Sequence, residues 1–197
     1  MKKNISPALL DSVKDALNRY SELPEHIYPE FLDNMELGQL SKGQIIIHQG
    51  AFNDKVFLVI EGGVRAYHVV EDKEYTDWFA LHGQFFSAIS CYFQGIPSTH
   101  TYAALQQTTY LVCSKAFLEG LADQHHAVER LMRKIITESF LTLQNRVVYH
   151  RFKSAKARYE ELLVGYPNLV HQVPMKHIAS YLGISPETLS RIRAEQV

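Results

Sequence analysis

Residues 175–194 restrict the fold of this chain more than any other segment, because they read as two short helices joined by a tight turn. Gly183 stands where the first helix must stop and where the backbone needs a positive φ. Ser185 and Pro186 then supply an N-cap and a first helical residue for the second helix. The apolar residues spaced for one buried face in each half are Ile178, Leu182, Leu189 and Ile192. The pattern predicts a helix-turn-helix.

A helix-turn-helix usually places its second helix in the major groove of DNA. Arg191 can form two hydrogen bonds to guanine, and Glu187 can accept one from cytosine. The alternative is a plain helical hairpin whose polar face is merely solvated. The residues predicted to contact DNA are Lys176, Ser185, Glu187, Thr188, Ser190, Arg191 and Arg193.

The charge of the chain is unevenly distributed, although the formal net charge is only −1. Residues 1–124 hold 9 Lys/Arg and 15 Asp/Glu, whereas residues 125–197 hold 11 Lys/Arg and 6 Asp/Glu. The positive half contains the predicted helix-turn-helix, and attraction to phosphate requires a local positive field. Chance segregation of surface charge is the alternative explanation.

The length and composition narrow the class of protein. A chain of 197 residues makes one large domain or two small ones. The sequence contains no apolar run near the ~20 residues that a membrane-spanning helix needs, and its first residues do not resemble a secretory signal. Cys91 and Cys113 provide neither a disulfide framework nor a CxxC metal pair. We therefore expect a cytoplasmic protein that does not bind membranes.

In the first half of the chain, the sequence pattern changes from one typical of helices to one typical of β-strands. Residues 6–37 are predicted to be helical, with a second short helix over 29–37. From Leu40 onward, short β-branched runs alternate with Gly and Asp turns. The predicted strands lie within 42–50, 56–60, 64–70, 75–81, 99–105 and 108–113, with an irregular stretch at 84–98. This spacing predicts an antiparallel barrel or jelly roll, whose interior is either filled or holds one small ligand.

The second half is predicted to be helical, beginning with a long helix over 127–149 that contains no Gly or Pro. One apolar stripe comprises Val128, Leu131 and Ile135, and a neighbouring stripe comprises Met132, Ile136, Phe140, Leu143 and Val147. Two stripes suggest two covered surfaces, the β-domain and a partner helix; a single wide core face is the competing explanation. A further helix is predicted over 154–164, followed by a loop or short strand at 169–173.

These features resemble the Crp/Fnr family of bacterial transcription regulators. Residues 43–50 and 56–63 are similar to the first strands of the family's cyclic-nucleotide-binding β-roll. Residues 185–191 resemble its recognition helix, including the Glu-x-x-Ser-Arg pattern of the Fnr branch. The resemblance covers residues 40–197. It implies an α+β fold with a helical lead-in and β-roll sensor domain (1–124), a dimerisation helix (125–150) and a helix-turn-helix domain (151–197).

The resemblance also implies the partners and the residues that read DNA. Glu187, Ser190 and Arg191 would occupy the base-reading positions. The expected partners are double-stranded DNA with a near-palindromic operator, a second copy of the chain, RNA polymerase and an unidentified small-molecule effector. The family's wing, a β-hairpin after the recognition helix, is not expected because few residues follow that helix. No catalytic residues are predicted, so the chain is not expected to be an enzyme.

The sequence departs from the family's cyclic-nucleotide binders at the effector pocket. Ala88 stands where a carboxylate would hold the ribose, and Ser98 stands where an arginine would pair with the phosphate. A buried phosphate without such a partner carries a large desolvation cost, so cyclic AMP is not expected to bind. The residues predicted to line the pocket for another ligand are Phe85, Phe86, Ser98, Thr99 and His100. In the alternative, Phe85, Phe86 and Tyr92 fill the pocket and the regulator needs no ligand.

Metal cofactors are not expected from the local patterns. No cysteine precedes Cys91, so the four thiolates of an iron–sulfur cluster are missing. The β-region contains His48, His68, His82 and His100, but the His-x-His pattern of a cupin does not occur. The remaining alternative function is a small-molecule-binding or cupin-like β-barrel whose C-terminal helices only mediate oligomerisation.

Overall fold

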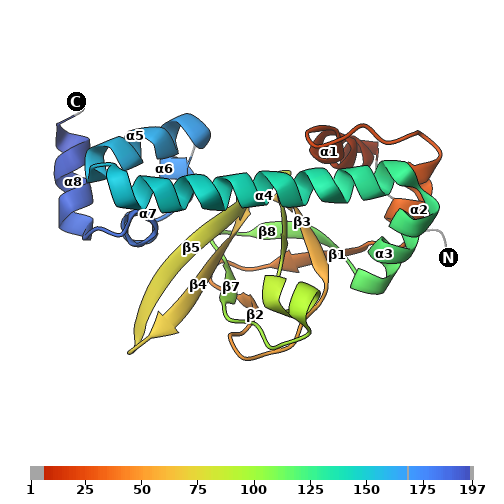
Figure 1. Ribbon diagram of the computed structural model, residues 1–197, viewed down its shortest axis with the longest axis horizontal. Coiled ribbons are helices and arrows are strands. Elements are labelled where there is room, and N and C mark those ends of the chain that lie inside the picture. The colour runs from red at the N-terminus through yellow and green to blue at the C-terminus, as the bar shows by residue number, and fades with distance from the viewer. Residues whose placement is uncertain (1–6, 168, 196–197) are drawn as a thin grey trace.

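The computed structural model describes residues 7–167 and 169–195. Figure 1 shows one long helix, α4 (His126–Phe152), running across the molecule above the β-strands. The helices α1 (Pro7–Asn18), α2 (Ile27–Asp33) and α3 (Lys115–Gln124) lie near its first half, and the remaining C-terminal helices gather at its other end. Within the described ranges, none of the helices combines the length and the hydrophobicity needed to cross a bilayer.

The strands of the described residues form two four-stranded antiparallel sheets. One sheet has the order β1-β8-β3-β6 and the other has the order β2-β7-β4-β5, so neighbouring strands are mostly distant in sequence. The turn spacing predicted an antiparallel barrel or jelly roll, and the resemblance implied the β-roll that these two sheets form. The strand bounds are β1 (Glu36–Leu40), β2 (Ile45–Ile47), β3 (Val56–Glu61), β4 (Gly63–Val70), β5 (Lys73–Leu81), β6 (Phe85–Ser87), β7 (Thr101–Ala104) and β8 (Thr108–Cys113).

Three sequence-based assignments differ from the structure. The predicted helix over 29–37 is wrong at its end, because α2 stops at Asp33 and Glu36–Leu40 pairs with β8 as a strand. The stretch at 84–98 contains β6 and a short π-helical turn, η1 (Ser90–Gln94). Residues 169–173 are not a loop or strand: α6 (Leu169–Gln172) is helical, and Leu169 and Val173 are buried against the C-terminal helices. In each case packing against distant residues selects the local structure.

The C-terminal helices begin at polar caps that the sequence supplies. Ser154 and Ser185 accept hydrogen bonds from the backbone N–H groups of Ala157 (3.2 Å) and Thr188 (3.2 Å), which are otherwise unpaired donors. They start α5 (Ala155–Gly165) and α8 (Pro186–Ala194). Between them lies α7 (Met175–Leu182). The buried faces of α5 to α8 share one core that also includes Phe79 and Leu105 of the roll.

Candidate nucleic-acid interface and sensor pocket

The turn between α7 and α8 has the predicted geometry. Gly183 adopts φ 66° and ψ 37°, a left-handed conformation that favours glycine. The N–H of Ile184 donates to the carbonyl of Ala179 at 3.0 Å, which closes the end of α7. Ile178, Leu182, Leu189 and Ile192 are all buried, so the two helices hold one another through the residues that the spacing identified.

The opposite face of α8 is open to solvent. Glu187, Ser190, Arg191 and Arg193 are exposed, and Lys176 is exposed on α7. Hydrogen bonds from its own backbone N–H and from Ser185 lower the pKa of Glu187, so this side chain stays ionised. An ionised carboxylate and a guanidinium therefore stand on one free helix face.

Several of the predicted contact residues also make local bonds. Thr188 is half-buried, and its hydroxyl lies 3.1 Å from Ser185 Oγ. Arg191 Nη2 donates to the same hydroxyl at 3.4 Å. Arg193 Nη1 lies 3.0 Å from the sulfur of Met175 on α7. Ser185 thus stabilises the start of α8, Thr188 accepts a hydrogen bond from Arg191, and Met175 contacts Arg193.

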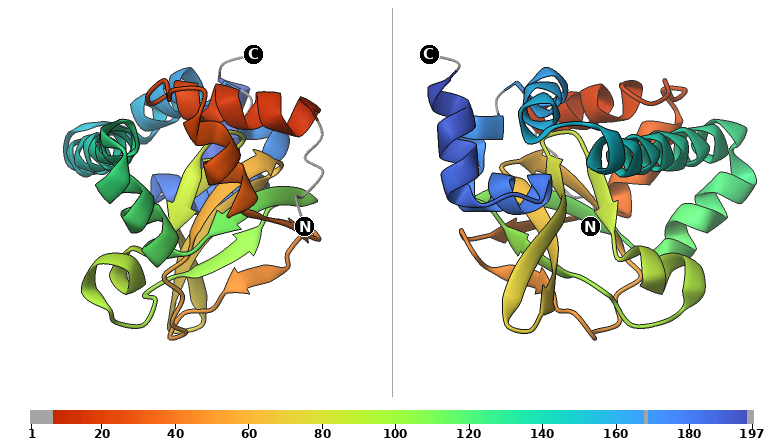
Figure 2. Two further views of the ribbon diagram at one scale, coloured as in Figure 1. Left: turned by 90° about the vertical axis from the view of Figure 1, so that its right-hand side faces the viewer. Right: turned by 60° about the vertical axis from the view of Figure 1, so that its left-hand side comes forward.

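The helix α7 is docked on the β4–β5 hairpin of the roll, as the right-hand view of Figure 2 shows. Ser180 Oγ accepts from the N–H of Thr76 at 2.9 Å and lies 3.2 Å from the carbonyl oxygen of Glu74. The buried side chain of Arg65 contacts both Glu74 and His177. Burial and the nearby charges of Arg65 and Lys176 lower the pKa of His177 to about 4, so its neutral ring can accept from Arg65.

Side chains fill the interior of the roll. The Phe86 ring is stacked on Phe57, with centroids 4.7 Å apart, and on Tyr102 at 5.9 Å. Trp78 packs edge-on against Tyr102 at 5.6 Å. The Tyr102 hydroxyl donates to the carbonyl of Ser87 at 3.0 Å. Aromatic rings therefore occupy the space between the sheets.

The predicted pocket residues do not all face this interior. Phe85 points to the other side of β6, where it packs against Tyr20 of the lead-in. Tyr92 belongs to the same hydrophobic cluster as Phe85 and Tyr20, outside the roll interior, and it lies next to Lys115. The pattern of successive side chains on opposite faces of a strand explains why Phe86 turns inward and Phe85 does not. The filling role that the sequence assigned to Phe85 and Tyr92 belongs instead to Trp78 and Tyr102.

Ala88 and Ser98, which the resemblance assigns to the ribose and phosphate positions, are both small and buried. Ala88 is packed in the roll interior. Ser98 is buried, and its hydroxyl donates to the carbonyl of His100 at 2.7 Å. Thr99 is exposed, and its Oγ1 lies 2.9 Å from His100 Nδ1.

Asp77 on β5 connects the roll to the long helix. Its Oδ2 atom lies 2.7 Å from both His68 Nδ1 and His100 Nε2. Arg146 of α4 donates to Oδ1 at 3.0 Å and also to the Asp77 carbonyl. Burial acts to raise the pKa of Asp77, but the hydrogen bonds from His100, His68 and Arg146 outweigh it and hold that pKa far below its ordinary value.

A β-bulge places Asp77 in this position. Trp78 pairs with Ala66, and Thr76 pairs with Tyr67, so Asp77 is an extra residue without a cross-strand partner. Bulges redirect a side chain relative to the regular alternation of a strand. The bulge thus brings the carboxylate to the side of the sheet where His68 lies.

Arg146 of α4 also contacts the helix-turn-helix. The Arg146 guanidinium lies 5.1 Å from the centre of the Tyr181 ring on α7, close enough for a cation–π interaction. Tyr181 in turn packs against Phe79 of β5, with centroids 5.4 Å apart. Sequence reasoning did not identify Asp77, Arg146 or Tyr181, because no local pattern marks residues that meet only through the fold.

The long helix α4 has one covered side and one open side. Val128 and Leu131 are buried, and Met132 and Ile135 pack partly against the same core. In the second stripe, Phe140 is 63% exposed and Leu143 is 57% exposed, and Ile136 and Val147 are also exposed. In this single chain the two stripes are therefore not one wide core face.

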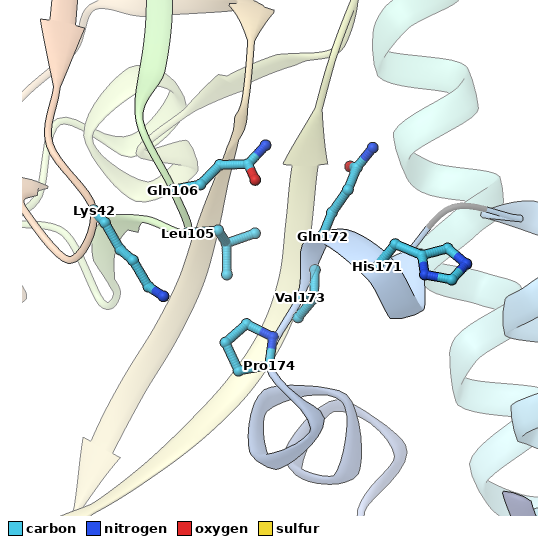
Figure 3. Close-up of a pocket in the computed structure, with 7 residues that line it drawn as sticks. All are labelled: Lys42, Leu105, Gln106, His171, Gln172, Val173 and Pro174. Atoms are coloured by element: carbon cyan, nitrogen blue, oxygen red, sulfur yellow. The ribbon is translucent and has the colours of Figure 1, made fainter.

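A shallow pocket of about 300 Å³ lies where the roll meets the C-terminal helices. Figure 3 shows that one wall comes from the roll and the other from the segment around α6. Its lining residues are Lys42, Leu105, Gln106, His171, Gln172, Val173 and Pro174.

Comparisons with known proteins agree with this architecture. Residues 37–125 match the family model of the cyclic nucleotide-binding domain. No curated protein matches the chain. FixK2 from Bradyrhizobium japonicum is 20% identical, with a TM-score of 0.71 over 82% of this chain and 83% of that one. A CooA mutant from Carboxydothermus hydrogenoformans is 23% identical, with a TM-score of 0.69 over 93% of this chain and 83% of that one.

The c-di-GMP-responsive global regulator CLP of Xanthomonas campestris is 14% identical, with a TM-score of 0.69 over 88% of this chain and 91% of that one. These neighbours are Crp/Fnr-family transcription regulators. The predicted resemblance and the predicted α+β fold class are confirmed at the level of the fold.

Proposed function

We propose that this chain, which shares the fold of Crp/Fnr-family regulators, is a dimeric, sequence-specific DNA-binding transcription regulator rather than an enzyme. The observation that carries the proposal is the free face of α8, where Glu187, Ser190 and Arg191 project from a capped helix. An arginine and a carboxylate that are exposed on the same helix can distinguish base pairs by the hydrogen-bonding groups at their major-groove edges. The excess of basic residues in 125–197 supports attraction to phosphate.

The proposed domains are a sensor unit over 1–124, a dimerisation helix over 125–150 and a DNA-binding unit over 151–197. In the dimer, the stripe Ile136, Phe140, Leu143 and Val147 would pack against the same stripe of a second copy. These positions repeat at intervals of four, three and four residues, which is the spacing of a coiled-coil seam. The two recognition helices would then reach successive major grooves, with RNA polymerase as a further partner at promoters.

The test is selection of binding sites from a library of random DNA duplexes, using the full chain. We expect an enriched near-palindrome with half-sites about 10 base pairs apart. Affinity for this site should exceed affinity for a scrambled duplex and should fall as salt rises. Failure to enrich any sequence, together with binding of a small molecule in the roll, would instead favour the small-molecule-binding β-barrel.

We do not expect cyclic AMP to be the effector. The family resemblance assigns the ribose and phosphate positions to Ala88 and Ser98, which carry neither a carboxylate nor an arginine, and aromatic rings occupy the roll interior. Isothermal titration calorimetry with cyclic AMP should therefore detect no binding at micromolar concentrations. Binding at an affinity typical of a specific ligand would contradict this expectation.

A further inference from the structure

We propose that His68, Asp77 and His100 form a binding site for a transition-metal dication. The three side chains come from β4, β5 and the segment before β7, and their ligand atoms all lie within 4.8 Å of one another. Two imidazoles and one carboxylate are a donor set that suits zinc, iron and related dications. Metal binding at these residues does not require DNA binding, so the test of this site is independent of the proposed function.

The geometry favours convergence on one ion. His68 Nδ1 and His100 Nε2 both lie 2.7 Å from the same Asp77 oxygen, Oδ2. Metal–ligand distances near 2 Å would require these nitrogen–oxygen distances to open by roughly 0.6 Å, which side-chain rotation can supply. An ion would replace the two protons that the imidazoles now share with the carboxylate.

The surroundings orient the three ligands. Once an ion replaces the Nε2 proton of His100, the Thr99 hydroxyl can accept from Nδ1–H, which keeps the ring neutral with Nε2 as its ligand atom. His68 is stacked on Tyr75, with ring centroids 5.6 Å apart. Arg146 uses Oδ1 and the backbone carbonyl of Asp77, so Oδ2 remains available to a metal.

Access and charge also bear on the site. The side chains of His68, Asp77 and His100 are 36%, 22% and 27% exposed, so an ion can enter from solvent and retain water in its open positions. The positive charge of Arg146 acts against a dication. The same contact places α4 next to the ion, so metal binding and the position of the long helix would influence one another.

The experiment is a titration of the EDTA-treated full chain with Zn²⁺ by calorimetry, and with Co²⁺ by visible absorption. We expect one ion per chain. His68→Gln and His100→Gln should each weaken binding by about tenfold or more, since even outer-shell partners of a metal contribute that much. His82→Gln is the matched control, because His82 is an exposed histidine of the same β-region that bonds to the Ile60 carbonyl instead.

Circular dichroism verifies that each variant remains folded, and Asp77 is left intact because its loss would also release Arg146. Equal Zn²⁺ affinity in the wild type, His68→Gln and His100→Gln would overturn the site and leave the cluster as a purely structural network. Binding of less than one ion by the wild type would overturn it as well. Displacement of Co²⁺ by millimolar Mg²⁺ would refute the transition-metal assignment, because Mg²⁺ prefers oxygen ligands.

Discussion

At the scale of single residues, Arg191 is the side chain that we expect to contribute most to the proposed DNA recognition. It is exposed, and its side chain makes a long hydrogen bond to Thr188 at 3.4 Å, so its guanidinium can turn toward a base edge. We expect Arg191→Ala to weaken binding to the selected site by about 1–3 kcal/mol, with little change on random duplex. Fluorescence anisotropy with both duplexes measures this. Equal losses on both would mean that Arg191 contacts only phosphate, as we expect for Lys176→Ala.

His177 provides a residue-scale prediction about pH. Its folded-state pKa is about 4 and its ordinary value is 6.5, so between these values the unfolded chain binds a proton that the folded chain does not. The free energy of unfolding should therefore fall as pH drops from about 6.5 towards 4. The charged groups facing His177 are Arg65 and Glu74 on the roll and Lys176 on its own helix.

The matched variant is His177→Gln, which retains an acceptor for Arg65 but cannot titrate. Urea unfolding of both proteins at several pH values should show the wild type losing more stability than the variant over this window. A stability difference that stays constant between pH 7 and 4 would contradict the assignment.

At the scale of elements, the turn between α7 and α8 depends on one backbone conformation. A Cβ at Gly183 would stand at a φ of +66° and 3.3 Å from the His150 ring. We expect Gly183→Ala to lower the free energy of unfolding by about 1–2 kcal/mol, the cost of a left-handed L-residue. Gly120→Ala is the control: it lies in α3 with no atom within 4 Å of the added Cβ, and should be neutral or stabilising. Urea unfolding in which both variants lose equal stability would contradict this account.

At the scale of the whole molecule, α4 joins the β-roll to the helix-turn-helix and leaves an apolar stripe exposed. We expect the wild type to be a dimer, and Phe140→Glu to produce a monomer, because two buried carboxylates would face one another across the seam. Light scattering coupled to size-exclusion chromatography measures the mass. Lys134→Glu is the control, since Lys134 is exposed and lies about 200° around the helix from Ile136. A monomeric wild type, or a dimeric Phe140→Glu variant, would refute the seam.

The sequence predicted the helix-turn-helix well because its signals are local. Gly183, Ser185 and Pro186 act within a few residues of where they stand, and the buried positions follow from helical spacing. The roll was predictable as a class from its turns, but β1 and α6 were not. Leu37 lies in a strand because it pairs with β8, a segment more than 70 residues away in the sequence.

The sequence by itself therefore determined where the chain turns, which residues of α7 and α8 are buried, and which side chains α8 presents to solvent. Only the tertiary structure decided that Trp78 and Tyr102 fill the roll, that one stripe of α4 stays open, and that Asp77 meets His68, His100 and Arg146. The physical reason is the distance along the chain over which each kind of interaction acts. Backbone preferences act over a turn or two, whereas Asp77 and Arg146 are 69 positions apart and meet only because a β-bulge and a 27-residue helix bring them together.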